Sequence, residues 1–329
     1  MSGVQHIDVT AGEADSRLDR WFKKRFPHVP HGMVAKLLRK GQIRVDGGRA
    51  KGDQRLEPGQ TVRVPPLPEP EAVQESPPLS AEDAAYARSL VIHEDREIIA
   101  LNKPHGLAVQ GGSKITRHVD RLLDAFGKGD QRPRLVHRLD KDTSGLLVVA
   151  RTAQGAKRLS RLFQTRDVKK TYWSVALGAP NPRAGEIKGF MRKAGGPDGE
   201  RMVAARHGEE GAQHALTRYA VADAAGQRAS WVVLRPETGR THQLRVHMAA
   251  LGHAILGDGK YMCDIPAPND LSHTLHLHAR KLEIPRAPGA GGGAPLVLEA
   301  ALPRHMTETF ARLGFDARDD LTLVEEALE

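Results

Sequence analysis

Prolines crowd one short segment of the chain and divide it in two. Six prolines fall among the fourteen residues 65–78, and neither a helix nor an inner strand tolerates this density, because proline lacks the amide hydrogen and fixes φ. Such a segment is expected to form an extended, semi-rigid linker. We therefore predict an N-terminal domain over residues 1–64, a proline-rich linker over 65–84 and a larger domain over 85–329. The length of 329 residues is consistent with about two domains.

Basic charge is concentrated in two blocks of the chain. The 49 Lys and Arg residues outnumber the 40 Asp and Glu residues, which gives a net charge of +9. Residues 1–64 hold 13 basic and 7 acidic residues, and residues 130–170 hold 11 basic and 4 acidic ones. Two blocks of this kind favour a polyanionic partner, although an ordinary solvated surface gives the same count.

Several classes of protein are disfavoured by composition. No run of about 18 apolar residues occurs, so a transmembrane helix is not expected. The first six residues lack the basic and then apolar pattern of a secretory leader. The single cysteine, Cys263, excludes an intramolecular disulfide and a cysteine-rich zinc site. We expect a cytoplasmic protein with no membrane partner.

Two helical patterns and a turn organise the N-terminal domain. Ser16 is predicted to cap a first helix, and a second helix with one basic face is expected to end at Gly41. Asp46-Gly47 predicts a hairpin turn. From residue 15 to 65 this order resembles the S4 RNA-binding domain, with an ordinary solvated basic face as the alternative. The resemblance implies that RNA phosphates are contacted by Lys36, Arg39, Lys40 and Arg44.

The most informative segment of the large domain is a polar loop that leads into an apolar strand. Residues 134–150 read RLVHRLDKDTSGLLVVA, and rigid strands commonly place reactive groups at such junctions. Asp140 lies near Arg138 and Lys141, and these cations favour its ionised form. A fixed carboxylate acts as a nucleophile or as a base. Taken alone, Asp140 would be better explained by a turn or a structural ion pair than by catalysis.

Several motifs in the large domain occur together in order. The segment 137–145, HRLDKDTSG, resembles the signature of the RluA family of RNA pseudouridine synthases. The resemblance covers roughly residues 85–305 and is greatest to the RluC-like large-subunit rRNA enzymes. It implies an α+β fold with a mixed, mainly antiparallel sheet. Further matching blocks lie at 102–109, 169–175, 236–247, 251–258 and 275–279.

The resemblance assigns roles to individual side chains. Asp140 matches the catalytic aspartate, and Tyr172 matches the tyrosine that stacks on the target base and handles a proton. Arg245 matches the arginine that pairs with the catalytic carboxylate, and Arg138 matches the one that fills the space left by the base. Leu277 is a candidate for the pocket wall. The remaining candidates for RNA contact in the same motifs are His137, Arg240 and His242.

The implied reaction converts uridine to pseudouridine. It breaks a C–N glycosidic bond, turns the uracil and forms a C–C bond, so the nucleotide must first leave its helix at a cost of a few kcal/mol. Stacking of the extruded base on Tyr172 would stabilise the flipped state by about 1–3 kcal/mol. No redox step or group transfer occurs, so no cofactor is expected. The expected partner of a monomeric enzyme is 23S rRNA or an assembly intermediate of the large ribosomal subunit.

Other functions remain open from the sequence alone. The substrate could instead be tRNA or another RNA, and a hydrolytic glycosylase would also use a carboxylate but would release free uracil. A noncatalytic RNA-binding factor for ribosome assembly would not need Asp140, Tyr172 and Arg245 together. Metal ligation by the histidines is not expected, because their spacing matches no metal motif. The histidines concerned are His242, His247, His253, His273, His276 and His278.

Overall fold

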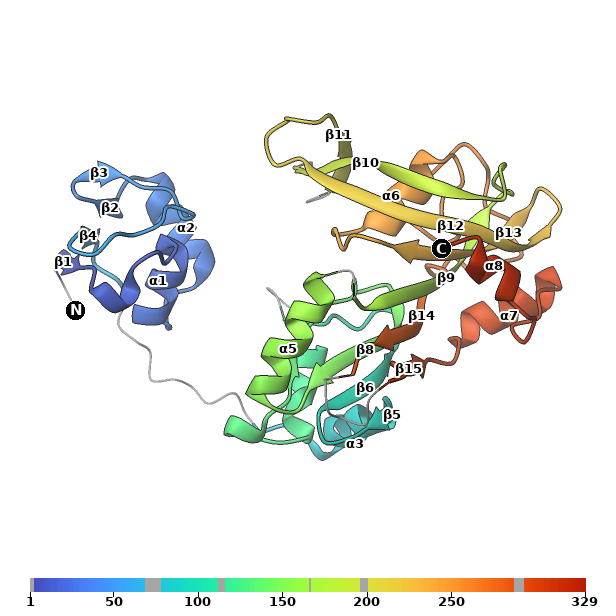
Figure 1. Cartoon of the computed structure of the whole chain (residues 1–329), viewed down its shortest axis with the longest axis horizontal. Helices are drawn as coiled ribbons and strands as arrows, with labels where there is room; N and C mark the ends of the chain where they lie inside the picture. The colour runs from blue at the N-terminus through green and yellow to red at the C-terminus, as the bar shows by residue number, and fades with distance from the viewer. Residues whose placement is uncertain (1–2, 69–77, 112–115, 166, 196–200, 287–292) are drawn as a thin grey trace. The chain divides into compact units, whose positions relative to one another are not determined.

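The computed structural model describes residues 3–68, 78–111, 116–165, 167–195, 201–286 and 293–329. The chain forms two compact units, Met1–Pro78 and Leu79–Glu329 (Figure 1). Residues 69–77 of the expected linker lie outside the described residues. Its C-terminal end differs from the prediction, because helix α3 already begins at Ala81, where the Ser80 side chain accepts a hydrogen bond from the Asp83 amide.

The small unit packs two helices against a sheet with the strand order β1-β4-β2-β3. Both helices bury one apolar face, and the aromatic side chains Trp21, Phe22 and Phe26 fill the centre of the core. The elements are β1 (Gln5–Asp8), η1 (Ala11–Glu13), α1 (Leu18–Arg25), α2 (His31–Arg39), β2 (Arg44–Val45), β3 (Gly48–Arg49) and β4 (Thr61–Val64).

Local signals in the small unit are largely confirmed. Asp46 and Gly47 adopt φ values of 49° and 77° between β2 and β3, as a two-residue hairpin requires, and Gly41 ends α2 with φ of 65°. The predicted cap is wrong, because Arg17 occupies the N-cap of α1. The first amides of this helix donate instead to backbone carbonyls of Gln54 and Gly52.

The large unit is built on one extended sheet. Its eleven strands have the order β11-β10-β12-β13-β9-β14-β8-β6-β5, with β15 beside β14 and β7 beside β8. All pairs are antiparallel except β14 with β8, so the expected mixed, mainly antiparallel α+β fold is confirmed. The strands are β5 (Val91–Glu94), β6 (Ile98–Lys103), β7 (Arg134–Leu135), β8 (Ser144–Ala150), β9 (Lys169–Leu177), β10 (Ala184–Ala194), β11 (Arg201–Ala205), β12 (Gln213–Ala225), β13 (Ala229–Pro236), β14 (Leu277–Ile284) and β15 (Leu296–Glu299).

Helices cover the faces of this sheet. Helix α5 packs beside β8, and α6 lies against β11, β12 and β13 (Figure 1). The C-terminal segment closes one core, in which Leu321, Val324 and Leu328 belong to the same hydrophobic cluster. No described helix is long and apolar enough to cross a bilayer. The helices are α3 (Ala81–Ser89), α4 (Val119–Leu122), η2 (Leu123–Ala125), η3 (Gly129–Gln131), α5 (Ala153–Gln164), α6 (Gln243–Ala250), α7 (Arg304–Leu313) and α8 (Thr322–Glu326).

The parallel contact of β8 and β14 positions the polar loop that precedes β8. Ser144 pairs with His278 and Gly145 with Ala279, so both strands begin at the same place in the sheet. Strand β9 lies on the other side of β14, where Tyr172 also pairs with Ala279. The loop before β8, the start of β14 and the start of β9 therefore meet at one edge of a pocket.

Candidate active site

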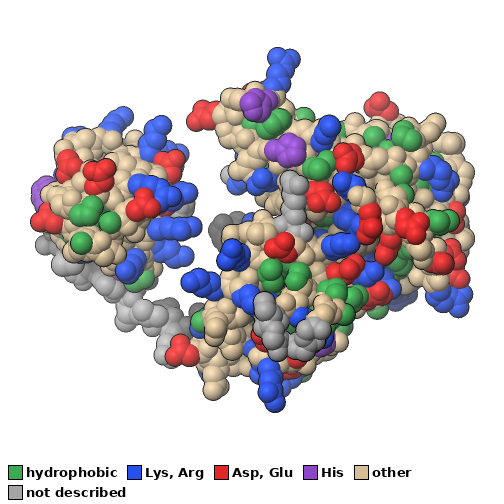
Figure 2. All heavy atoms as spheres, in the orientation of Figure 1, with side chains coloured by type: hydrophobic (Ala, Val, Ile, Leu, Met, Phe, Trp, Pro, Cys, Tyr) green, Lys and Arg blue, Asp and Glu red, His purple; other side chains and the backbone are tan. Residues whose placement is uncertain are grey.

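A cavity of about 490 Å³ lies where these strands meet, within the size range of ligand pockets. Its lining comes from the β7–β8 loop, α5, β9, the β13–α6 loop, α6 and the first residue of β14. All candidate residues predicted in the large domain are brought together here: His137, Arg138, Asp140, Tyr172, Arg240, His242, Arg245 and Leu277. On the visible face of both units, Lys and Arg side chains are interspersed with acidic ones (Figure 2).

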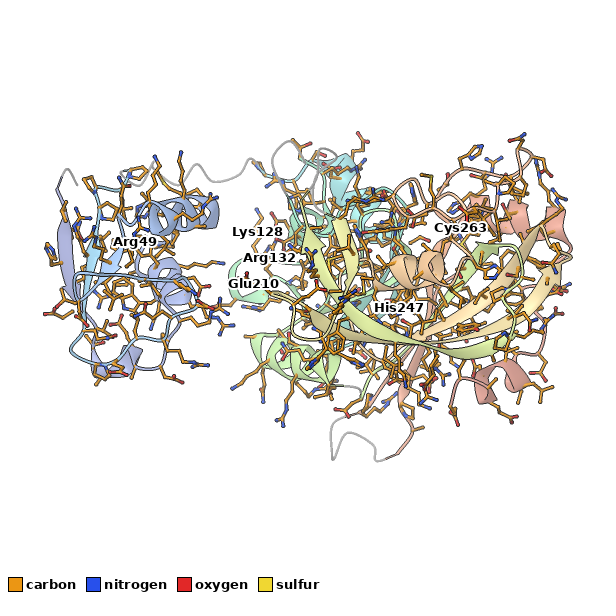
Figure 3. All side chains as sticks on the ribbon, turned by 90° about the horizontal axis from the view of Figure 1, so that it is seen from above. Arg49, Lys128, Arg132, Glu210, His247 and Cys263 are labelled. Carbon is orange, nitrogen blue, oxygen red and sulfur yellow. The ribbon has the colours of Figure 1, made fainter. Side chains whose placement is uncertain are left out.

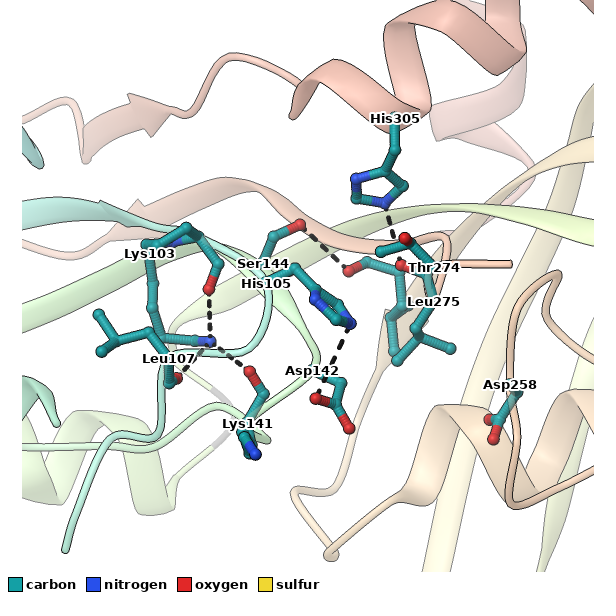
Figure 4. Close-up of polar contacts among 12 residues, drawn as sticks. Lys103, His105, Leu107, Lys141, Asp142, Ser144, Asp258, Thr274, Leu275 and His305 are labelled. Atoms are coloured by element: carbon teal, nitrogen blue, oxygen red, sulfur yellow. Dashed lines mark hydrogen bonds and ion pairs between the residues drawn. The ribbon is translucent and has the colours of Figure 1, made fainter. Parts of the chain in front are cut away.

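Backbone contacts fix the loop that carries Asp140. The Lys103 ammonium is fully buried and donates to the carbonyl oxygens of Pro104, Leu107 and Lys141 at 2.9–3.0 Å (Figure 4). Burial lowers the pKa of this ammonium to about 8, so it stays charged at neutral pH. The Gly106 amide also donates to the Lys141 carbonyl. Lys103 thereby ties strand β6 to the residue that follows Asp140.

Tyr172 lies half-buried on β9 with its ring in the cavity lining. Burial raises the pKa of the Tyr172 phenol well above its usual value, and the negative charge of Asp140 raises it further. The phenol therefore keeps its proton at neutral pH. A protonated phenol beside a carboxylate is able to donate a hydrogen bond, and its ring offers a face for a base.

Arg245 forms its bidentate pair with Asp258, which corrects the expectation that it pairs with Asp140. Its Nε and Nη2 atoms each donate to the Asp258 carboxylate at 2.7 Å, and both side chains are buried. The same carboxylate also accepts hydrogen bonds from the amides of Lys260 and Tyr261. These bonds fix its position beside the guanidinium. Asp140 instead lies beside His242, whose Nε2 is 3.9 Å from the Asp140 Oδ2.

His137 forms part of the cavity wall. Its ring stacks on Phe163 with centroids 4.0 Å apart, and its Nε2 accepts a hydrogen bond from the Val148 amide at 2.9 Å. Burial lowers the pKa of His137 to about 3, so the ring is neutral. The contact of His137 with RNA stays a prediction. Because Nε2 already accepts a hydrogen bond from the protein, only the rest of the ring is available for it.

The mouth of the cavity carries exposed cations. Arg138 and Arg240 are both exposed there, and the Arg240 Nε donates to the His214 carbonyl at 3.0 Å. Leu277 is buried and provides an apolar part of the lining. Exposed guanidinium groups around an apolar, ring-lined cavity suit a nucleotide whose phosphates stay outside and whose base enters.

Three residues of the site were not assigned a role from the sequence. Gln243 accepts from Thr238 Oγ1 and the Arg240 amide, and so holds the β13–α6 loop in shape. Lys170 lines the cavity, and burial lowers the pKa of its ammonium. Asp258 ends the matching block at 251–258, but the local sequence does not identify Arg245 as its partner. The KKTY and THQLR segments are the available signals for Lys170 and Gln243.

The histidines form no metal site within the part of the chain that the structure describes. Figure 3 shows His247 and Cys263 well apart in the large unit. Three of the histidines are buried and bond to hydroxyl groups: His247 to Thr217, His276 to Thr309 and His278 to Ser144.

Comparison with known proteins agrees with this geometry. Residues 97–250 match the family model described as RNA pseudouridylate synthase. Ribosomal large subunit pseudouridine synthase C of Escherichia coli is 33% identical over 293 residues, which cover 88% of this chain and 90% of that protein. The mitochondrial RNA pseudouridine synthase 4 of Arabidopsis thaliana is 39% identical over 282 residues, which are 74% of this chain but only 59% of that protein. The solved structure of human RNA pseudouridylate synthase domain containing 4 matches 72% of this chain and 99% of its own, with 31% identity and a TM-score of 0.59.

Fold, cavity and relatives together define an enzyme that rearranges a nucleoside within RNA. The sequence motifs place it further within that class. The chain belongs to the RluA family of RNA pseudouridine synthases.

Proposed function

We propose that this RNA pseudouridine synthase modifies uridines of 23S rRNA in the large ribosomal subunit. The observation that carries the proposal is the alignment with Ribosomal large subunit pseudouridine synthase C of Escherichia coli, which includes 90% of that protein and both units of this chain. The similarity to a mitochondrial synthase makes the RNA target the point to be tested, with tRNA as the second candidate. That the enzyme is monomeric, that it is cytoplasmic and that its N-terminal unit is an S4 domain stay predictions.

In the proposed reaction Asp140 is the reactive carboxylate. The carboxylate lies in the cavity within reach of the half-buried Tyr172 ring, on a loop that Lys103 holds in place. The flipped uracil would stack on Tyr172 while Arg138 occupies the space it leaves. Nothing beyond these side chains is required for bond isomerisation, because the reaction neither oxidises nor transfers a group.

The test is pseudouridine mapping on defined RNAs. Protein-free 23S rRNA and bulk tRNA are incubated with the wild-type enzyme, with Asp140→Asn or with Asp142→Asn, and carbodiimide-dependent reverse-transcription stops are recorded. Asp142 is a matched control, since it is a half-buried carboxylate of the same loop that lies 3.8 Å from His105. We expect new stops in 23S rRNA with the wild type and Asp142→Asn, and none with Asp140→Asn. Stops confined to tRNA would refute the proposed target, and equal stops with Asp140→Asn would remove Asp140 from the reaction.

A further inference from the structure

A series of polar contacts leads from strand β11, at the edge of the sheet, to Asp140. The Met202 amide of β11 donates to the Tyr261 hydroxyl at 3.0 Å. That hydroxyl lies 2.7 Å from Nδ1 of His242, with the two rings edge to face at 5.5 Å. The opposite nitrogen of the same imidazole, Nε2, lies 3.9 Å from the Asp140 carboxylate. His242 therefore stands between a fixed hydroxyl and the reactive carboxylate.

The backbone holds His242 in an unusual conformation. Its φ of 53° is in the left-handed region, which few residues other than glycine adopt. The surrounding hydrogen bonds maintain it, since the His242 carbonyl accepts from Val246 and the next amide, Gln243, donates to Arg240. Strained backbone of this kind persists where neighbouring structure imposes it and is concentrated at active sites. Here it turns the imidazole towards Asp140 at the beginning of α6.

The charges around His242 decide its protonation state. Burial lowers the pKa of the imidazole, and Arg245 and Lys260 lower it further, while Asp140 and Asp258 oppose them. Burial raises the pKa of the Tyr261 phenol, so the hydroxyl keeps its proton. A neutral imidazole has one donor and one acceptor nitrogen. If the nitrogen facing the carboxylate carries the proton, Nδ1 is the acceptor and Tyr261 donates to it.

We propose that His242 is a positioning residue that donates a hydrogen bond from Nε2 to Asp140, in a tautomer selected by the Tyr261 hydroxyl. This role rests on the proposed function of Asp140 as the reactive carboxylate. The separation of 3.9 Å exceeds a hydrogen bond and closes when RNA fills the cavity, as catalytic contacts commonly tighten in the substrate complex. The sequence assigned His242 to RNA contact, which predicts weaker binding on substitution. The positioning role predicts a slower reaction at unchanged binding.

The first test removes only the hydroxyl that selects the tautomer. Tyr261→Phe, which loses the contacts with Met202 and His242, is compared with Tyr219→Phe, a control whose buried ring loses the hydroxyl that donates to the Pro182 carbonyl. We expect Tyr261→Phe to reduce the single-turnover rate of pseudouridine formation about 10- to 100-fold at saturating RNA, with its Kd for RNA unchanged. Tyr219→Phe should retain the wild-type rate. Equal rates for both variants would overturn the proposal.

The second test changes the donor itself. The side-chain N–H of Gln lies near the position that Nε2 of histidine occupies, whereas that of Asn lies near the position of Nδ1. Asn is also well tolerated at positive φ. We expect His242→Gln to retain more of the single-turnover rate than His242→Asn, both with wild-type Kd for RNA. A loss of RNA affinity without a change in rate would assign His242 to binding instead. Far-ultraviolet circular dichroism and thermal unfolding of each variant establish that it is folded.

A spectroscopic signature reports the tautomer without any RNA. In ¹⁵N-histidine spectra, with His242→Asn used for assignment, the wild-type ring should show its proton on Nε2 at neutral pH. Tyr261→Phe should shift the ring towards the other tautomer, because the hydroxyl that donates to Nδ1 in the proposed tautomer is lost. An unchanged tautomer in Tyr261→Phe would refute the proposal that the Tyr261 hydroxyl selects it. If the wild-type enzyme forms no pseudouridine, the proposed function fails whatever the spectra show.

Discussion

Gly145 illustrates how closely two backbones approach beside the active site. This residue has φ of 105°, and a Cβ atom placed there would lie 2.3 Å from the carbonyl oxygen of Ala279. It is the second residue of β8, which follows the loop that carries Asp140, and it lies at the parallel contact with β14. Only a residue without a side chain permits this contact. Glycine at this position is therefore required by both the backbone and the site.

We expect Gly145→Ala to lower the free energy of unfolding of the large unit by about 2–4 kcal/mol, since both φ and the contact become unfavourable. The rate of pseudouridine formation should fall as well, because the displaced strand carries the loop of Asp140 with it. Gly189→Ala on β10 is the control, as nothing lies within 4 Å of its Cβ position. Urea unfolding of both variants measures the difference, and equal midpoints would contradict the close approach.

Lys103 is the second residue whose removal tests the loop. Lys103→Met removes the ammonium donor from the carbonyl oxygens of Pro104, Leu107 and Lys141, of which Lys141 keeps the Gly106 amide, and we expect a loss of about 3 kcal/mol in the free energy of unfolding. Lys141→Met is the control, because that side chain is exposed in the same loop. Chemical denaturation measures both. A stability equal to that of the control would mean that the ammonium does not anchor the loop.

At the scale of elements, strand β14 joins the active site to a buried polar layer. Leu277 begins the strand at the cavity, while His276 and His278 on either side are fully buried. Desolvation lowers the pKa of both imidazoles to about 4, and that of His247 on α6 to about 4 as well. All three rings are therefore neutral in the folded state at neutral pH.

These histidines make the stability of the large unit depend on pH. Their unfolded pKa is about 6.5, so between about pH 6.5 and 4 the unfolded chain binds protons that the folded chain does not. The free energy of unfolding is therefore full above pH 6.5 and falls on acidification, by about 1.4 kcal/mol per pH unit for each histidine. Urea titrations across this range measure the slope.

Replacement of one imidazole identifies the source of that slope. His278→Asn should reduce the pH dependence by about one proton equivalent, whereas the exposed control His207→Asn should leave it unchanged. Identical slopes for the two variants would assign the acid sensitivity to other groups.

Elements with strong local signals were predictable from the sequence. The Asp46-Gly47 turn and the apolar run of β8 carry their own signals, and the structure confirms both. Strand β1 was not predicted, because its 4 residues are held only by pairing with the distant β4. The pocket residues were predicted from the motifs, but the pair Arg245 with Asp258 was not. Which charges meet depends on how distant segments pack.

At the scale of the whole molecule, RNA contact is predicted for both units. The four cations predicted to contact phosphate on and after α2 are all exposed, namely Lys36, Arg39, Lys40 and Arg44. Arg44 also donates from its guanidinium to the carbonyls of Gly41 and Gly47, so it stabilises the turn as well. We therefore regard Lys36, Arg39 and Lys40 as the cleaner test of RNA binding by this unit.

We expect replacement of Lys36, Arg39 and Lys40 together by Ala to weaken RNA binding and to make the plot of log K against log salt shallower by about 2–3 units. The matched control replaces Arg20, Lys23 and Lys24 of helix α1, which removes the same charge from other exposed positions. Filter binding across salt concentrations measures both. Equal slopes would show that net charge, rather than the α2 surface, determines affinity.

Strand β8 has a consequence for how the protein behaves when heated. All seven of its residues are buried, and none carries a charge. Such a segment pairs readily with copies of itself once exposed, and the charged residues on either side, Asp142 and Arg151, only partly prevent this. Heating then ends in aggregate instead of a reversible equilibrium. The apparent Tm is accordingly a kinetic quantity, which rises as the protein is scanned faster.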